Sequence, residues 1–141
     1  MELDGAIDYS LKLDLNAPDQ IAALPAPALL EGLRVRIDPR RSAEAMRILG
    51  VRLTDSGQDL ALHVRRGVLE AVEGVPEEAD VVIELTKPVV LGMVYRSLYG
   101  AFAQAERAGQ AAVTKGTLQE VQEFLAYFDD IDPAPIRLSD R

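Results

Sequence analysis

The apolar last third of the chain is the sequence feature that most constrains its fold. Residues 88–102 form an apolar helical stretch, residues 110–114 have the pattern of a short strand, and Thr117 starts a second apolar helix. These two helical regions hold more apolar side chains than one helix face needs to cover a sheet. We therefore expect them either to close on each other as a solid core or to leave a hollow between helices and sheet.

Seven apolar side chains of these regions are the candidates for lining such a hollow: Val90, Met93, Val94, Leu98, Phe102, Leu125 and Phe128. The alternative is that they simply fill the core. Ligand pockets are concave and mostly apolar, which fits the first interpretation. Each methylene of a buried alkyl chain contributes about 0.8 kcal/mol, so a tail of about eight carbons could supply several kcal/mol before ordering costs.

A strand meander is predicted before the apolar helices. Alternating or continuous apolar runs predict strands over 47–54, 60–64, 68–72 and 79–86, and a fifth over 110–114. Tight turns are expected at 55–57 and 66–67. The fold class is therefore α+β, with a sheet of about five mainly antiparallel strands that is covered by helices.

Helices are concentrated at both ends of the chain. An early helix is predicted to start near Pro18 and to end before Pro25, and another spans 27–35. Thr117 and Glu120 have the spacing of a capping box, which predicts the start of the last helix. We expect the apolar helix between them to bend at 99–100.

Residues 1–16 form an N-terminal extension, and 17–141 form the main domain. Ile7 to Leu15 alternate strictly between apolar and polar residues, which predicts a half-buried strand. That pattern fits an internal strand. It fits equally a strand that adds to a sheet edge in a partner, which would give a homodimer or a contact with a catalytic domain.

Composition excludes several classes of function. The net charge of −8 makes nucleic acid and anionic lipid surfaces poor partners. No apolar run approaches about 18 residues, so we expect no membrane span and a soluble protein, which is cytoplasmic if the chain is complete as given. The compartment is otherwise open, because the absence of cysteine is uninformative about it.

Catalytic chemistry finds little support in the residues. A catalytic zinc site takes three protein ligands, commonly histidines, and His63 is the only histidine. It is predicted to lie at an outward position of a strand, as an ordinary surface residue. The acidic pairs at 77–78 and 129–130 are predicted to be solvated charges. We expect no catalytic residue, no metal and no cofactor in this chain.

A family resemblance extends over about 110 residues from Leu30 onward. Its segments are Leu33-Arg34-Val35-Arg36-Ile37-Asp38-Pro39, the stretch 50–57, Arg66-Gly67-Val68-Leu69, the stretch 79–86, the stretch 105–116 and the stretch 124–131. In order and spacing they resemble the C-terminal domain of alkyl sulfatases of the metallo-β-lactamase class, which has the sterol carrier protein fold. The usual Gly-Asp before the last helix is here Gly116-Thr117, and the family's aromatic ending is replaced by Pro133-Ala134-Pro135-Ile136.

The resemblance implies non-catalytic binding of a hydrophobic small molecule, such as an alkyl chain, a fatty acid or a sterol-like compound. In such enzymes the domain is taken to guide alkyl chains toward a separate zinc-containing hydrolase domain. Three functions therefore stand side by side. The chain is a lipid-binding domain, a ligand-free structural or dimerisation module, or a fragment of a zinc-dependent sulfuric ester hydrolase.

Overall fold

The computed structural model describes residues 24–130, and nearly all of them belong to one compact unit, Ala26–Ile131. The predicted strand over 7–15, the early helix and the division at residue 16 lie outside the described residues. Helix α3 (Ala26–Glu31) opens the unit and tightens into the 3-10 turn η1 (Gly32–Val35). This pair occupies the predicted helix over 27–35, with its last turn wound more tightly.

Within the described residues, five strands form one sheet: β1 (Met46–Leu53), β2 (Gln58–Arg65), β3 (Val68–Glu73), β4 (Val81–Leu85) and β5 (Ala112–Lys115). Their spatial order is β3-β2-β1-β4-β5. Three of the four pairings are antiparallel, and β1 pairs with β4 in parallel. The prediction of a five-stranded, mainly antiparallel sheet in an α+β fold is thus confirmed.

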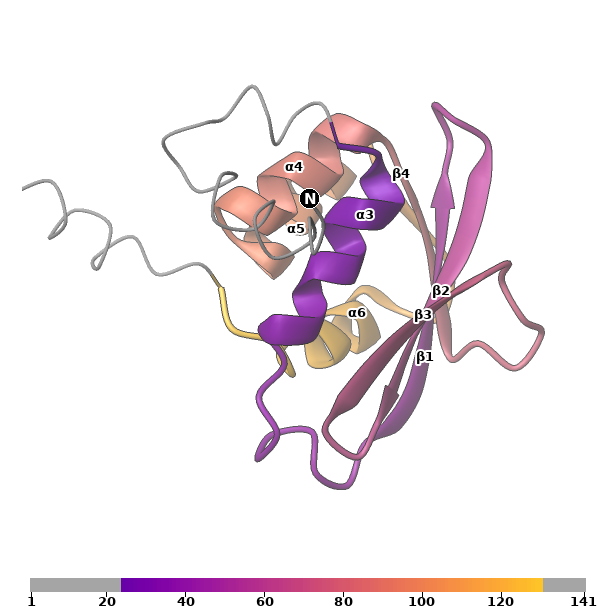
Figure 1. Cartoon of the computed structure of the whole chain (residues 1–141). Coiled ribbons are helices and arrows are strands. Elements are labelled where there is room, and N and C mark those ends of the chain that lie inside the picture. The colour runs from indigo at the N-terminus through magenta and orange to yellow at the C-terminus, as the bar shows by residue number, and fades with distance from the viewer. Residues whose placement is uncertain (1–23, 131–141) are drawn as a thin grey trace, which may run out of the picture. The chain divides into compact units, whose positions relative to one another are not determined.

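All helices of residues 24–130 lie on one side of this sheet, which we call its inner face (Figure 1). The remaining helices are α4 (Lys87–Tyr95), α5 (Leu98–Arg107) and α6 (Leu118–Leu125). Alternate strand residues point at them, because successive side chains of a strand face opposite ways. The buried inner face comprises Leu49, Val51, Leu53, Leu60, Leu62, Val64, Val81, Ile83 and Leu85.

The outer face is covered at its centre by the loop 74–80, which connects β3 to β4 and projects on the side away from the helices (Figure 1). Gly50 makes room for it, since a Cβ there would stand 2.7 Å from Val75 Cγ1. Side-chain hydrogen bonds help to hold the loop. The Ile48 amide donates to Asp80 Oδ2 (2.8 Å) and Lys115 Nζ donates to the Glu77 carbonyl (2.9 Å).

Candidate ligand-binding site

The seven predicted pocket residues all lie in the helical layer above the inner face. Val90, Met93 and Val94 belong to α4, Leu98 and Phe102 to α5, Leu125 to α6, and Phe128 follows α6. Six of them are at most 4% exposed, and Val94 is half-buried. Helix α5 contacts both α4 and α6, and α6 contacts β1, so the three helices form one continuous layer on the sheet.

Aromatic rings close the layer at the end of α6. The ring centroids of Phe124 and Phe128 are 5.8 Å apart, and those of Phe124 and Tyr127 are 6.1 Å apart in an edge-on arrangement. A capping box fixes the other end of this helix, as the spacing of Thr117 and Glu120 predicted. Thr117 Oγ1 accepts from the Glu120 amide (3.1 Å), and Glu120 Oε1 accepts from the Thr117 amide (2.9 Å).

The apolar helix breaks at 96–97, and the predicted bend at 99–100 is wrong. Ser97 is the N-cap of α5, and its side chain accepts a hydrogen bond from the Gly100 amide (3.1 Å). A serine in this position satisfies an amide that has no partner within the helix, so the helix starts at Leu98, before the glycine. Gly100 is part of this cap, since a Cβ on it would stand 2.8 Å from Ser97 Oγ.

Arg36 and Asp130 hold the two helix ends at this break. Arg36 Nη1 donates to the Val94 carbonyl near the end of α4 (2.8 Å), and Asp130 Oδ1 accepts from the Leu98 amide at the start of α5 (2.7 Å). A cation near a helix C-terminus and an anion at an N-terminus both complement the helix dipole. The acidic pair 129–130 is exposed, as expected of solvated charges, and it also takes part in hydrogen bonds.

Arg36 is half-buried and donates hydrogen bonds from two of its guanidinium nitrogens. Its Nε donates to the Asp129 carbonyl (2.8 Å), while its Nη2 is buried and has no hydrogen-bond partner in the described structure. Burial lowers the pKa of the Arg36 guanidinium, and the nearby carboxylates of Asp130 and Asp129 partly oppose that shift. Nothing in the local sequence marks this role, because Val94 is 58 residues away and Asp129 is 93 residues away.

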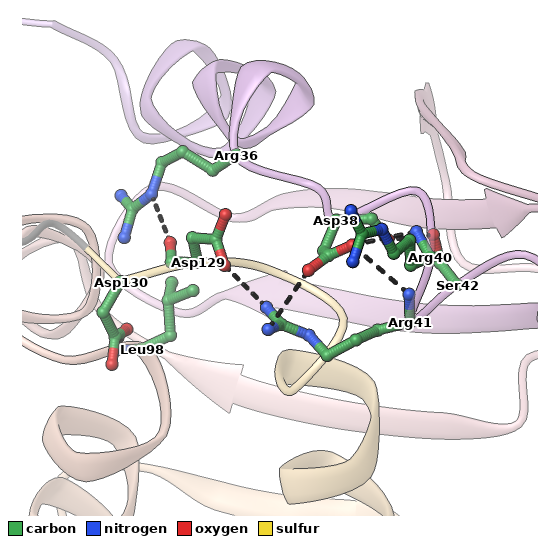
Figure 2. A network of polar contacts seen from close by, with 8 residues as sticks. All are labelled: Arg36, Asp38, Arg40, Arg41, Ser42, Leu98, Asp129 and Asp130. Atoms are coloured by element: carbon green, nitrogen blue, oxygen red, sulfur yellow. Dashed lines mark hydrogen bonds and ion pairs between the residues drawn. The ribbon is translucent and has the colours of Figure 1, made fainter.

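A short antiparallel contact brings Phe128 beside this arginine. Ile37 and Phe128 form a β-bridge, and the Asp129 amide donates to the Arg36 carbonyl (2.7 Å). Figure 2 shows Arg36 and Arg41 reaching Asp129 from different sides. The segment after η1 and the segment after α6 are thereby tied together at the edge of the apolar layer.

Asp38 organises the turn that follows. Its Oδ1 accepts from the Arg40 and Arg41 amides (2.8 and 3.3 Å), and its Oδ2 lies 3.3 Å from Arg41 Nη1 (Figure 2). The hydrogen bond from the Arg40 amide is the main reason that the pKa of the Asp38 carboxyl lies below its usual range. The buried Ser42 hydroxyl donates to the Asp38 carbonyl (2.8 Å), which closes the turn.

No cluster of three or more histidine, cysteine, aspartate or glutamate side chains suited to a metal occurs in residues 24–130. His63 is half-buried on the outer face, so it is less exposed than predicted. Its two ring nitrogens are buried and accept or donate no hydrogen bond within the described residues. Among the same residues, no helix is long and apolar enough to cross a membrane.

The five-stranded sheet and its helical layer agree with the known proteins that the chain resembles. Residues 14–134 match the family model described as "Alkyl sulfatase C-terminal". The chain belongs to this alkyl sulfatase C-terminal family. It is 28% identical over 149 residues to a linear primary-alkylsulfatase from a Pseudomonas species, in an alignment that covers the whole chain and 28% of that enzyme.

Solved structures agree with this family and show the fold that the chain shares with sterol carrier proteins. A stereoselective inverting sec-alkylsulfatase from a Pseudomonas species aligns with a TM-score of 0.68 and 28% identity, over 79% of this chain and 17% of that one. Palmitated SCP2L2 from Aedes aegypti, a sterol carrier protein relative, aligns with a TM-score of 0.52 over 77% of this chain and 100% of that one. Its identity is 13%, so it shows the shared fold alone. The chain therefore spans less than a third of the alkylsulfatases it matches.

Proposed function

We propose that this domain binds the alkyl chain of an amphiphile, without covalent chemistry, in the apolar layer between α4, α5, α6 and the inner face of the sheet. The observation that supports this most is the fold shared with a sterol carrier protein relative whose solved structure is palmitated. The proposed lining comprises Val90, Met93, Val94, Leu98, Phe102, Leu125 and Phe128. They offer buried hydrocarbon from three adjacent helices.

Energetics favours an alkyl ligand over a polar one in this layer. The seven side chains carry no hydrogen-bonding group other than the weakly accepting thioether of Met93, so a polar ligand would lose its hydration with little compensation. An alkyl tail, by contrast, gains about 0.8 kcal/mol for each methylene removed from water. Met93 adds adaptability, because its flexible thioether side chain can fit chains of different shape.

Family membership supports a second, coarser proposal about the role of this binding. We propose that the domain serves an alkyl sulfatase active site that lies outside the described residues, by holding the hydrophobic part of the substrate. The chain contributes no catalytic residue in this proposal. Sulfate ester hydrolysis would then fall when alkyl binding falls, and purified domain alone would show binding without turnover.

The test is titration of the purified chain with dodecyl sulfate below its micellar concentration, and with a fluorescent fatty acid in competition. We expect saturable binding near one ligand per chain. Val94→Asp should weaken it at least about tenfold, because a carboxylate at this half-buried position penalises hydrocarbon beside it. Val72→Asp, at a half-buried position of β3 on the outer face, is the matched control and should change it less than twofold. Absence of saturable binding to the wild type would support a solid core instead.

A further inference from the structure

One end of the sheet gathers exposed apolar side chains that the fold does not use. Met46 of β1 is paired with Arg65 of β2, and Arg65 is paired with Val68 of β3, so the three side chains form one row on the outer face. Met46 is 61% exposed and Val68 is 62% exposed. The other large exposed hydrophobic residue of the described chain is Val35, 89% exposed, at the end of η1, which contacts β3.

Arginines surround this row. The Arg66 amide donates to the Ala45 carbonyl (2.8 Å), and the Gly67 amide donates to the Ser42 carbonyl (3.1 Å), so the β2–β3 turn packs on the loop 36–45. Figure 1 shows that loop and the β2–β3 turn together at the lower end of the sheet. The loop carries Arg40, which is exposed like Arg65 and Arg66. None of these three arginines forms an ion pair with another described residue.

Charge is distributed unevenly along the chain. Residues 34–66 hold eight arginines and only four aspartates and glutamates, although the whole chain has a net charge of −8. Glu44 and Glu70 lie at this end and reduce its positive charge, and Asp38 and Asp129 are already paired with Arg41. At physiological ionic strength charges are screened over about 8 Å, so a partner in contact with this end experiences the local arginines more than the net charge.

We propose that this end of the sheet, the row Met46–Arg65–Val68 with Arg40 and Arg66, docks onto the negatively charged surface of a lipid bilayer. Arginines attract anionic headgroups, and exposed apolar side chains among them enter the interfacial region. In this proposal the attraction from the local arginines outweighs the repulsion from the net negative charge, which by itself predicts that anionic lipid surfaces are poor partners. The proposal goes beyond the proposed alkyl binding and does not depend on it, because this surface is present whether or not a ligand occupies the core.

Other occupants fit this surface less well. A second copy of the chain related by two-fold symmetry would bring the same arginines face to face, and like charges in contact are unfavourable. The row and the flanking residues Arg40 and Arg66 include no aromatic side chain. The surface therefore offers nucleic acid no aromatic platform for base stacking. Exposed methionine and valine instead favour contact with a hydrocarbon surface.

The experiment is flotation of the full chain with extruded vesicles of phosphatidylcholine, with and without about 30% phosphatidylglycerol, at low and high salt. We expect the partition coefficient on the anionic vesicles to exceed that on neutral ones at least about tenfold and to fall with salt. Arg40→Glu combined with Arg65→Glu should reduce it at least about tenfold. Met46→Ser combined with Val68→Ser should reduce it severalfold at either salt concentration.

Arg107→Glu is the matched control, because Arg107 is exposed in the last turn of α5 and the same charge is reversed there. It should change the partition coefficient less than twofold. Failure of the wild type to float with anionic vesicles, or an equal loss in Arg107→Glu, overturns the proposal. So does tighter binding to an oligonucleotide or an acidic protein at the same salt. Dodecyl sulfate binding and thermal unfolding of each variant separate failure of this surface from failure of the alkyl site or of folding.

Discussion

Arg36 Nη1 lies 2.8 Å from the carbonyl oxygen of Val94 and places a cation at the C-terminal end of α4. The same guanidinium reaches the Asp129 carbonyl through Nε. Burial lowers the pKa of the Arg36 guanidinium, and the nearby carboxylates of Asp130 and Asp129 oppose that shift. The residue therefore joins three segments that are distant in sequence: the stretch after η1, the end of α4 and the stretch after α6.

Arg36→Met should lower the free energy of unfolding by about 2–3 kcal/mol, since it removes two charge-assisted hydrogen bonds and keeps only the aliphatic stem. Urea denaturation followed by circular dichroism measures this change. Arg34→Met is the control, because Arg34 is exposed in η1, and its effect should stay within about 0.5 kcal/mol. Equal effects of the two substitutions would contradict the role assigned to Arg36.

Gly50→Ala should destabilise the domain by about 1–3 kcal/mol, because the added Cβ would collide with Val75 of the covering loop. The decisive measurement is a double-mutant cycle with Val75→Ala. Removing the valine methyl groups makes room for the new Cβ, so the double variant should be more stable than the two single effects predict by addition. Simple additivity would show that the loop does not pack on Gly50.

Asp38 should contribute to the acid sensitivity of the fold. Its carboxyl has a lowered pKa in the folded state, so its stabilisation is fully present above the ordinary aspartate pKa of about 3.9 and is lost as pH falls through the folded value. Asp38→Asn should therefore flatten the dependence of the melting temperature on pH below about pH 4. Glu44→Gln, at an exposed position of the same loop, is the control and should leave the slope unchanged.

Binding of alkyl sulfates should strengthen with chain length. Each added methylene between octyl and dodecyl sulfate should tighten binding about fourfold, which corresponds to about 0.8 kcal/mol. Calorimetric titration of the series, at concentrations below micelle formation, measures this increment. A flat series would mean that the tail stays in water and that the headgroup alone is recognised at the surface.

Periodicity is sufficient to predict the strands, since it depends on neighbours along the chain. The strands over 47–54 and 68–72 correspond to β1 and β3, and Thr117 and Glu120 form the predicted cap of α6. Burial in β1 and β2 alternates only toward one end of each strand; 49–51 and 60–62 are buried on both faces, because helices cover the inner face and the loop 74–80 covers the centre of the outer face. Burial of a sheet face selects apolar residues at alternate positions, and this spacing can be recognised in the sequence.

Long-range contacts were not predictable in the same way. The break between α4 and α5 depends on the Ser97 cap and on Arg36 and Asp130, which approach from other parts of the fold. The parallel pairing of β1 with β4 likewise follows from the route of the loop 74–80. The seven residues proposed to line the pocket lie in α4, α5 and α6 or, for Phe128, just after α6, but whether a ligand enters among them depends on packing that apolar composition does not encode.

The parallel pairing of β1 with β4 sets an order of assembly. The β1–β2 and β2–β3 hairpins join residues close in sequence, whereas Leu53 and Leu85 become neighbours only after all of the intervening chain has been placed. Contacts between distant residues form slowly, because the entropy of closing the loop is lost before the contact gains anything. During synthesis the three-stranded meander can therefore form early, when only α3 and η1 are available to cover its inner face, and α4, α5 and α6 arrive last. Until then this face is the part of the nascent chain most exposed to aggregation.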